Sequence, residues 1–495
     1  MGPVSARVPD PSVAGPLREA LVRCNYNTGG LMVALGGDAE SSPGEAPVHS
    51  RRLGTDDQAV LVRLFSLGLD VDAERARTAL APALLEDLER GGLIEVDRGG
   101  RVRCPIRISP FEGLLLAHDP EVVDNPEPDI VTGLNSAART LASLTPRRPA
   151  GRALDVGTGS GVQALLAAKH SDRVVATDVN PRALAFTELG AALSGFDHVE
   201  CREGSFFDPI EGEQFDLVVS NPPYVISPDA QLVYRDGGLE RDEVSRIAVT
   251  GAASHLADGG LAMVLANWVH EAREPWDRPL HDWLEGSGCD ALLLHHLSED
   301  GLEYAAKWNT RYRRDPETHA RVLDRWTSYY REAGIGALAT GGVALRRRSR
   351  GDPRVTTVEM ATGPSGNGGE HVLRMLDASG LLAEGSDAAL LATPLALVPG
   401  HTLHRERRHT GEGYGPETVR MVLDDSAGLA SEFGPAVAAI LVGLDGTRTP
   451  DDLVPLLAQA LPGTDDEIRG AVLVAVRTLV VQGLVAPATP AAPAP

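Results

Sequence analysis

At 495 residues the chain is too long for one hydrophobic core, so we expect about three domains. Its composition, 43% hydrophobic and 23% charged, is typical of a globular protein, and no apolar run is long enough to cross a bilayer. The net charge of −23 argues mildly against a nucleic-acid partner, because proteins that bind phosphates normally carry a basic face. A local basic patch would overturn that argument.

The four cysteines lie far apart, and no Cys/His spacing typical of a metal site is present. We therefore expect no disulfide framework and no bound metal, and a cytoplasmic location. The N-terminus shows no signal-peptide pattern. Much Ala, Gly, Arg and Pro with little Lys is typical of a high-GC bacterial genome.

The first part of the chain has a mostly helical pattern. Residues 1–15 are expected to be a disordered leader, and residues 16–108 a small domain. Within that domain Leu93–Val96 and Arg101–Cys104 flank the turn Asp97–Gly100, which predicts a β-hairpin after the helices. Helices followed by such a hairpin indicate a winged-helix-like domain, which can bind DNA or dock a protein. The lack of a basic recognition helix disfavours DNA binding.

Residues 109–149 are interpreted as a connecting segment, and residues 150–350 as an α/β domain. In the α/β domain apolar strands alternate with helical segments, which predicts a doubly wound, Rossmann-like parallel sheet. The clearest strands are Arg152–Val156, Arg173–Asp178, Phe215–Ser220 and Gly260–Ala266.

The last part of the chain follows the basic run Arg346–Arg348, which we interpret as a solvated strand end or linker. Residues 351–485 predict a mostly helical accessory domain, again winged-helix-like, and residues 486–495 a disordered tail. Three histidines among arginines in the accessory domain are interpreted as a solvated segment rather than a metal or phosphate site. They are His401, His404 and His409.

A glycine-rich loop follows the first strand of the α/β domain. Gly157, Gly159 and Gly161 let the backbone turn sharply and approach an adenosyl-type ligand closely. Asp155 before the loop suits a ligand with a cationic amino-acid part, and Asp178 at the end of the next strand can accept hydrogen bonds from ribose hydroxyls. A nucleotide-dependent oxidoreductase is the alternative on these two motifs alone.

Three motifs together resemble the class I S-adenosylmethionine methyltransferases: Asp155–Gly161, Asp178 and Asn221–Tyr224. The most similar branch contains the release factor glutamine methyltransferases and the ribosomal-RNA guanine-N2 methyltransferases. The segment Tyr234–Leu239 resembles the guanine-N2 branch somewhat more. The resemblance covers residues 150 to 270 and implies a seven-stranded methyltransferase sheet with S-adenosyl-L-methionine as cofactor.

The resemblance also implies individual site residues. The cofactor would contact the glycine loop including Thr158, the two aspartates, and Asn221. In the family an acidic residue after the third strand usually contacts the adenine, but here Ser205 stands in that place, with Phe206 as a candidate to pack on the ring. The expected cofactor-binding residues are Asp155, Gly157, Thr158, Gly159, Gly161, Asp178, Ser205, Phe206 and Asn221.

The sequence Asn-Pro-Pro-Tyr suits chemistry on a conjugated nitrogen, which is a poor nucleophile because its lone pair enters a π-system. The side-chain carbonyl of Asn221 and the main-chain carbonyl of Pro222 would accept its N–H groups and stabilise positive charge. Pro222 and Pro223 fix φ and remove two competing donors, and Tyr224 would stack on a planar substrate. We therefore predict Asn221, Pro222, Pro223 and Tyr224 as the catalytic loop.

The methyl acceptor stays open between ribosomal RNA, a translation-related protein, and a small metabolite or peptide from a biosynthetic pathway. The Arg235–Gly238 segment favours RNA, whereas the net charge favours a protein glutamine. A non-catalytic binding protein on a methyltransferase scaffold is the alternative from another class. The flanking domains are expected to dock the substrate.

Overall fold

The fold was obtained as a computed structural model that describes residues 8–37, 45–121, 127–229, 235, 238–271, 273–411, 413–429, 431–459 and 461–488. The chain divides into two compact units. The first comprises Met1–Ala142, Arg148–Ser287 and Ser298–Ala339. The second comprises Ser143–Arg147, Gly288–Leu297 and Thr340–Pro495. No helix among the described residues is long and apolar enough to cross a membrane.

The N-terminal part of the first unit is a helical cluster with a small sheet, as the sequence predicts. Its helices are α1 (Ala14–Arg23), α2 (Thr28–Leu35), α3 (Ala46–Arg52), α4 (Asp57–Leu61), α5 (Ala73–Leu80) and α6 (Leu85–Arg90). The sheet has the order β1–β3–β2, with β1 at Val71–Asp72, β2 at Glu95–Val96 and β3 at Arg101–Arg103. The hairpin of β2 and β3 closes through Asp97, whose carboxylate accepts hydrogen bonds from the Gly99 and Arg101 amides.

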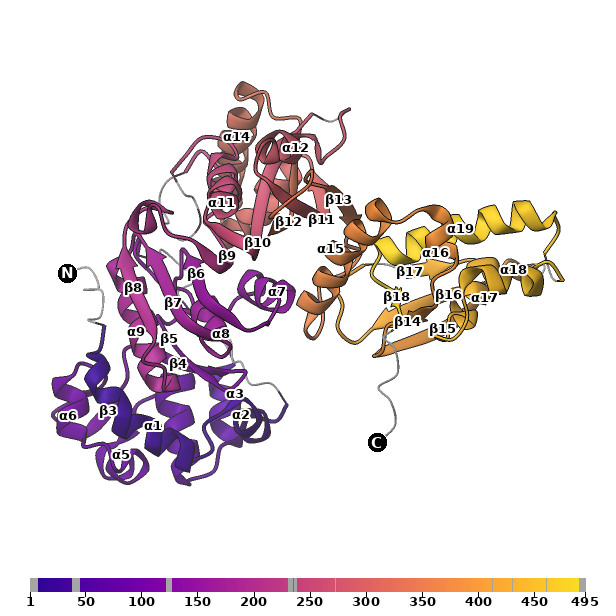
Figure 1. The fold of residues 1–495 in the computed structure, drawn as a ribbon. Helices are drawn as coiled ribbons and strands as arrows, with labels where there is room; N and C mark the ends of the chain where they lie inside the picture. The colour runs from indigo at the N-terminus through magenta and orange to yellow at the C-terminus, as the bar shows by residue number, and fades with distance from the viewer. Residues whose placement is uncertain are drawn as a thin grey trace. The chain divides into compact units, whose positions relative to one another are not determined.

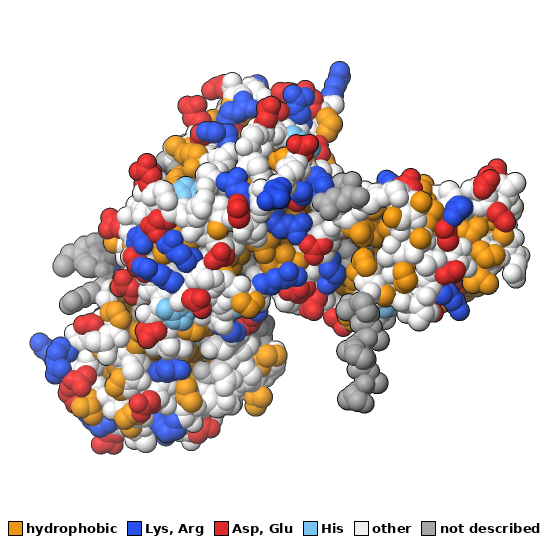
Figure 2. Space-filling model, in the orientation of Figure 1, with side chains coloured by type: hydrophobic (Ala, Val, Ile, Leu, Met, Phe, Trp, Pro, Cys, Tyr) orange, Lys and Arg blue, Asp and Glu red, His pale blue; other side chains and the backbone are white. Residues whose placement is uncertain are grey.

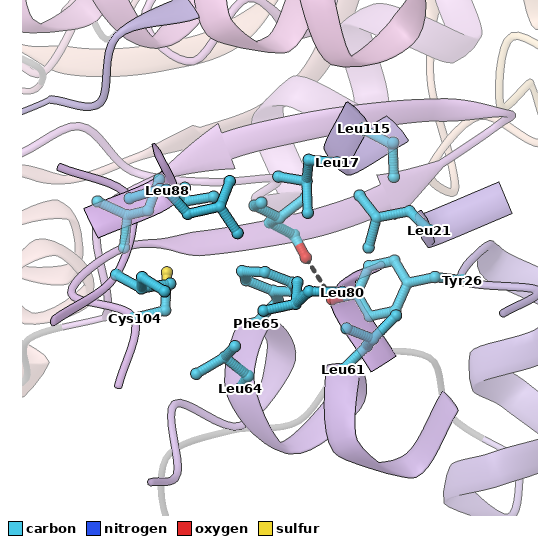
Figure 3. Packing of buried hydrophobic residues seen from close by; sticks show 14 of the residues in the cluster. Leu17, Leu21, Tyr26, Leu61, Leu64, Phe65, Leu80, Leu88, Cys104 and Leu115 are labelled. Atoms are coloured by element: carbon cyan, nitrogen blue, oxygen red, sulfur yellow. Dashed lines mark hydrogen bonds between the residues drawn. The ribbon is translucent and has the colours of Figure 1, made fainter. Parts of the chain in front are cut away.

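The core of this helical cluster continues into the α/β domain. Leu17, Leu21 and Phe65 pack with Leu115 of strand β5 (Leu114–His118) in one buried cluster (Figure 3). The Tyr26 hydroxyl lies within this cluster and donates a hydrogen bond of 2.7 Å to the Ile108 carbonyl. The helical cluster is therefore packed against the domain that follows it.

The predicted connecting segment contains regular structure. Strand β4 (Arg107–Phe111) pairs antiparallel with β5, and helix α7 (Ser136–Leu144) follows. The segment reads as a linker in the sequence because it is interrupted by prolines and acidic residues. The hairpin forms nevertheless, because β5 packs on α9 (Pro181–Ser194).

Five parallel strands of the first unit lie in the order β10–β9–β6–β7–β8 (Figure 1). The chain starts at β6, adds β7 and β8 on one side, and then returns to add β9 and β10 on the other, as expected for a doubly wound sheet. Helix α8 packs on β6 and β7, α9 on β7 and β8, and α11 on β9 and β10. The bounds are β6 Ala150–Val156, α8 Val162–Ala168, β7 Ser171–Asp178, β8 Val199–Glu203, β9 Phe215–Ser220, α11 Glu243–Ser254 and β10 Leu256–His270.

The predicted strands match these elements because apolar, β-branched runs of this length bury both faces of a parallel sheet. The central strand β6 ends in four buried residues, and β9 is buried at all but one of its six positions. The pairing aligns Val156 of β6 with Ser220 of β9 and with Thr177 of β7. The loops after these three strands therefore leave the sheet at the same edge.

The first unit also contains α12 (Arg278–Leu284) and a helical segment at residues 301–332, which we call the cap. The cap consists of α13 (Gly301–Trp308), η4 (Thr310–Tyr312) and α14 (Pro316–Glu332). Asp300 and Asp315 begin α13 and α14 by accepting hydrogen bonds from backbone amides of the first turns. Trp326 and Tyr330 of α14 are buried against Tyr304 of α13.

The second unit begins with β11 (Cys289–Glu299), β12 (Ala337–Arg347) and β13 (Val355–Glu359). Strand β13 pairs in parallel with β11. This pairing, within the second unit, adds a strand that the sequence did not predict. Sequence reasoning missed β13 because its polar and partly buried residues lack the apolar run of the other strands.

The remainder of the second unit contains more strand than the helical pattern predicts. Strands β15, β16 and β17 form an antiparallel sheet, and β14 pairs with β18. Strand β15 consists mostly of exposed polar residues, so its sequence has no alternating apolar pattern from which a strand could be predicted. The bounds are α15 Gly368–Glu384, α16 Asp387–Leu391, β14 Leu395–Leu397, β15 His401–His409, β16 Tyr414–Leu423, β17 Ser431–Phe433, α17 Pro435–Gly443, α18 Pro450–Leu457, α19 Asp465–Val481 and β18 Val485–Pro487.

Candidate active site

The three loop glycines adopt the backbone conformation that the sequence predicts. Gly157, Gly159 and Gly161 have φ values of 73°, 56° and 80°. A Cβ atom at Gly161 would lie 3.0 Å from the Thr187 hydroxyl, so helix α8 can begin there only without a side chain. At Gly157 and Gly159 a Cβ would meet no described atom within 4 Å. These two glycines expose the backbone to open space, where a ligand can approach it.

Asp155 lies below the glycine loop and is 1% exposed. Its carboxylate accepts hydrogen bonds from the Thr158 hydroxyl at 2.8 Å and from the Ala164 amide at 2.9 Å. Burial raises the pKa of Asp155 to about 7, although both hydrogen bonds act in the opposite direction. The carboxyl group therefore changes its charge near neutral pH.

Asp178 ends β7 and connects the strand to the glycine loop. Its two oxygens accept hydrogen bonds from the Gly159 amide at 3.0 Å and from the Asn180 amide at 2.9 Å. Burial raises the pKa of Asp178 above its ordinary value. Each carboxylate oxygen has a second lone pair, which leaves acceptor capacity for a ligand.

The loop Asn221–Tyr224 begins where β9 ends. The Ser220 hydroxyl donates a hydrogen bond of 2.9 Å to the Val156 carbonyl and so joins the ends of β9 and β6. The Pro222 carbonyl accepts a hydrogen bond of 2.8 Å from the Tyr224 amide. Among the described residues, none makes a hydrogen bond with the Asn221 side chain.

A cavity of about 370 Å³ brings most predicted site residues together. The predicted residues that line it are Asp155, Gly157, Thr158, Gly159, Asp178, Ser205, Phe206, Asn221, Pro222 and Pro223. Gly161 lies just outside, at the start of α8. Tyr224 also lies outside this lining and is partly buried against the aromatic cluster of the cap, where burial raises its pKa to about 12.

The cavity has a further side that the motifs did not indicate. It is formed by Ile130, Val131, Thr132, Gly133 and Asn135, from the predicted connecting segment, and by Asn180. The only sequence signal for any of them is Asn180-Pro181, which is typical of a helix start. The Asn180 side chain donates a hydrogen bond of 2.9 Å to the Asp129 carbonyl and so connects this side to α9.

An ion pair fixes the same side of the cavity. The Arg182 guanidinium donates two hydrogen bonds to Asp119, and both side chains are about nine-tenths buried. Asp119 also accepts a hydrogen bond of 2.9 Å from the Val131 amide, next to the cavity. Sequence reasoning missed this pair because its members are 63 residues apart.

Two further predicted stretches contribute residues to the cavity lining. Ser205 and Phe206 both line the cavity. Phe206 has a positive φ of 44°, and its carbonyl accepts a hydrogen bond of 3.3 Å from the Thr177 hydroxyl. Of the segment Tyr234–Leu239, residues 234, 236 and 237 lie outside the described residues. Gly238 lines the cavity.

These features fit S-adenosylmethionine. The cavity is lined by the open backbone of Gly157 and Gly159 and by the carboxyl groups of Asp155 and Asp178. Asn221 lines its other edge, and no described residue makes a hydrogen bond with the Asn221 side chain. The model of the methyltransferase small domain matches residues 131–276, which span most of the cavity lining. Two domains of unknown function match the flanks, DUF7059 at residues 23–104 and DUF7782 at residues 375–487.

Relatives with known names match the same part of the chain. A release factor glutamine methyltransferase of Xylella fastidiosa is 34% identical over 217 residues, which are 41% of this chain and 74% of the relative. One from Deinococcus radiodurans is 40% identical over 128 residues, 23% of this chain and 44% of the relative. The ribosomal RNA small subunit methyltransferase C of Cronobacter sakazakii is 32% identical over 137 residues, 27% of this chain and 36% of the relative. The chain therefore belongs to the class I methyltransferases of the Asn-Pro-Pro-Tyr branch and is an enzyme whose cofactor is S-adenosylmethionine.

Proposed function

We propose that this enzyme transfers a methyl group to a planar nitrogen of a macromolecule, either ribosomal RNA or a translation-related protein. The observation behind this proposal is the place of Asn221, at the edge of the cavity formed by the glycine loop. The names of the relatives support both kinds of acceptor. Acceptors of this kind imply a cytoplasmic enzyme.

Asn221 and Pro222 would orient the acceptor nitrogen. The Asn221 amide oxygen can accept one N–H, because no described residue occupies it. The Pro222 carbonyl already accepts one hydrogen bond from Tyr224, and its second lone pair can accept another N–H. Two preorganised acceptors would draw the nitrogen out of conjugation and stabilise its developing positive charge.

The remaining residues would hold the cofactor. When bound, S-adenosylmethionine supplies an electrophilic methyl group. Asp178 would accept hydrogen bonds from the ribose. Asp155 would attract the cationic amino group of the cofactor, which can come close because Gly157 and Gly159 have no side chains. Ser205 and Phe206 would contact the adenine. Tyr224 would stack on the acceptor, a role that requires its partly buried ring to reach the incoming group.

Asn221→Ala tests this assignment. The variant is expected to bind S-adenosylmethionine with unchanged affinity in calorimetry, because the glycine loop and both aspartates remain. Methyl transfer is expected to fall by orders of magnitude. Normal turnover in the variant would place the active site elsewhere, and a wild-type protein that does not bind the cofactor would be a binding protein rather than an enzyme.

The acceptor class can be measured with tritiated cofactor. The enzyme is incubated with a cell extract that is then separated into protein, RNA, DNA and small molecules. Label in RNA or protein that disappears with Asn221→Ala supports the proposed function. Label only in small molecules would instead identify a biosynthetic methyltransferase.

A further inference from the structure

The helical cap is bound to the chain just beyond the active-site loop. The Ile226 amide donates a hydrogen bond of 3.2 Å to the Tyr304 hydroxyl, and the Ile226 carbonyl accepts one of 2.8 Å from Tyr330. The Trp326 indole donates a hydrogen bond of 3.0 Å to Asp229. Both backbone groups of a residue two positions after Tyr224 are therefore held by side chains of the cap.

The cap has the opposite charge balance from the whole chain. Over residues 301–332 the sequence contains seven Lys and Arg residues against five Asp and Glu residues, whereas the whole protein carries −23. All residues of this segment are described. The basic residues are Lys307, Arg311, Arg313, Arg314, Arg321, Arg325 and Arg331.

Most of this positive charge is available to a partner. Lys307 and Arg325 are paired with Glu299 and Asp229. Arg313 and Arg314 are exposed in the turn between η4 and α14, and no described residue forms a hydrogen bond or ion pair with either guanidinium. In Figure 2, basic side chains with acidic ones between them lie in the area where Figure 1 draws α14.

Aromatic rings lie among these arginines. The Arg311 guanidinium stands 4.7 Å from the centre of the Tyr312 ring. Tyr312 and Trp308 are only partly buried, and they pack against the same cluster as Tyr224. Guanidinium groups beside partly exposed rings suit a nucleic acid, because arginines contact phosphates while rings and guanidinium planes stack on unpaired bases.

We propose that the cap is the surface on which an RNA acceptor docks. This inference rests on the proposed function and selects RNA from its two acceptor classes. A polyanion is repelled by most of this acidic protein, so its encounter is directed to the basic segment beside the active-site loop. An acidic protein could meet the same charge, but it would gain little from the partly exposed rings.

The test compares two triple charge reversals in the full chain. The cap variant is Arg313→Glu/Arg314→Glu/Arg321→Glu. The matched control is Arg18→Glu/Arg75→Glu/Arg98→Glu, three exposed arginines of the N-terminal helical cluster. Both variants change the net charge equally, and thermal unfolding and cofactor calorimetry confirm that each is folded.

Binding is measured by fluorescence anisotropy with a labelled RNA stem-loop at several salt concentrations. The cap variant is expected to bind the RNA about tenfold or more weakly than wild type. The slope of log affinity against log salt concentration should become shallower by about one unit for each phosphate contact that is lost. The control should bind as wild type does. Equally weakened binding in both variants, wild-type binding by the cap variant, or equally tight binding of labelled polyglutamate would overturn the proposal.

The same variants separate this inference from the proposed function. Tritiated methyl found in protein but not in RNA, and abolished by Asn221→Ala, would overturn RNA docking while it supports macromolecular N-methylation. Label in RNA that disappears in the cap variant, with cofactor affinity unchanged, supports both.

Discussion

The Tyr330 hydroxyl donates a 2.8 Å hydrogen bond to the carbonyl of Ile226, and Tyr330 is separated from the active-site loop by about a hundred residues of sequence. Tyr304 accepts from the amide of the same residue and from the Asn267 side chain at 2.5 Å. Ile226 is 1% exposed, so neither backbone group can turn to water. The chain leaving Tyr224 is thus held on both sides by phenol groups.

Tyr330→Phe is expected to lower kcat several-fold while leaving the affinity for S-adenosylmethionine unchanged. The substitution leaves the buried Ile226 carbonyl without its donor, at a cost of about 1–3 kcal/mol, and loosens the loop that aims Asn221. Kinetics and cofactor calorimetry measure the two effects separately. Tyr329→Phe is the control, because its hydroxyl accepts from Arg241 rather than from this chain segment. Equal changes in kcat and cofactor affinity would indicate general destabilisation instead of positioning.

Asp155 predicts a pH dependence of cofactor binding. Burial raises its pKa to about 7, so the carboxyl group gains negative charge as the pH rises from about 6 to about 8. A cationic amino group binds the charged form better, and the affinity for S-adenosylmethionine should therefore increase over this range. Asp155→Asn should flatten the profile. Thr158→Val, which removes a hydrogen bond that stabilises the carboxylate, should shift the midpoint upward. A profile that is identical in all three proteins would contradict the assignment.

The sequence predicts those site residues whose type suits both the local backbone conformation and the proposed contact with the ligand. Gly157 and Gly159 have the positive φ that their residue type suggests, and Asp178 ends its strand, as the apolar run before it indicates. Parallel pairing then places Asn221 at the same edge of the sheet. The sequence alone could predict where these residues lie, because each stands at or directly after the end of a predicted strand.

The parts that the sequence could not predict depend on contacts between distant segments. Val131 and Asn135 line the cavity because a hairpin and an ion pair hold them there, and neither residue type is typical of a ligand site. The sequence of the cap predicts only an aromatic helix. The hydrogen bonds of Tyr304 and Tyr330 to the Ile226 backbone join residues far apart in the sequence, so the sequence could not predict them. Likewise β13 lacks an apolar run, and pairing with β11 is what makes it a strand.

Arg182→Gln is expected to destabilise the first unit by roughly 3–5 kcal/mol, because it leaves the Asp119 carboxylate buried without its cation. Since Asp119 also binds the Val131 amide, cofactor affinity should fall as well. Arg173→Gln is the matched control. Its pair with Glu200 is exposed, and its removal should cost less than about 1 kcal/mol. Urea unfolding and cofactor calorimetry provide the measurements, and equal destabilisation of both variants would contradict a special role for the buried pair.

His371 predicts a loss of stability in the second unit at acidic pH. Its Nε2 donates a hydrogen bond of 2.6 Å to the Gln482 carbonyl, and its Nδ1 accepts one of 3.1 Å from the Ala427 amide, an arrangement that only the neutral ring can make. Burial lowers the pKa of His371 from 6.5 to about 4. The unfolded chain binds a proton below about pH 6.5 while the folded chain does not, so stability is present above that pH and declines as the pH falls toward about 4. The full decrease is about 3 kcal/mol.

Hydrogen exchange gives a local measurement of this effect. After correction for the intrinsic exchange rate, protection of the Ala427 amide should fall between about pH 7 and about pH 5 in the wild-type protein. His371→Gln should remove that pH dependence, and His404→Gln, at an exposed position of β15, should retain it. If His371→Gln does not fold, the imidazole proton resonances of His371 in the wild-type protein decide the question. A midpoint near the ordinary histidine value of about 6.5 in those resonances would contradict the buried neutral ring, whereas the absence of titration down to about pH 5 would agree with it.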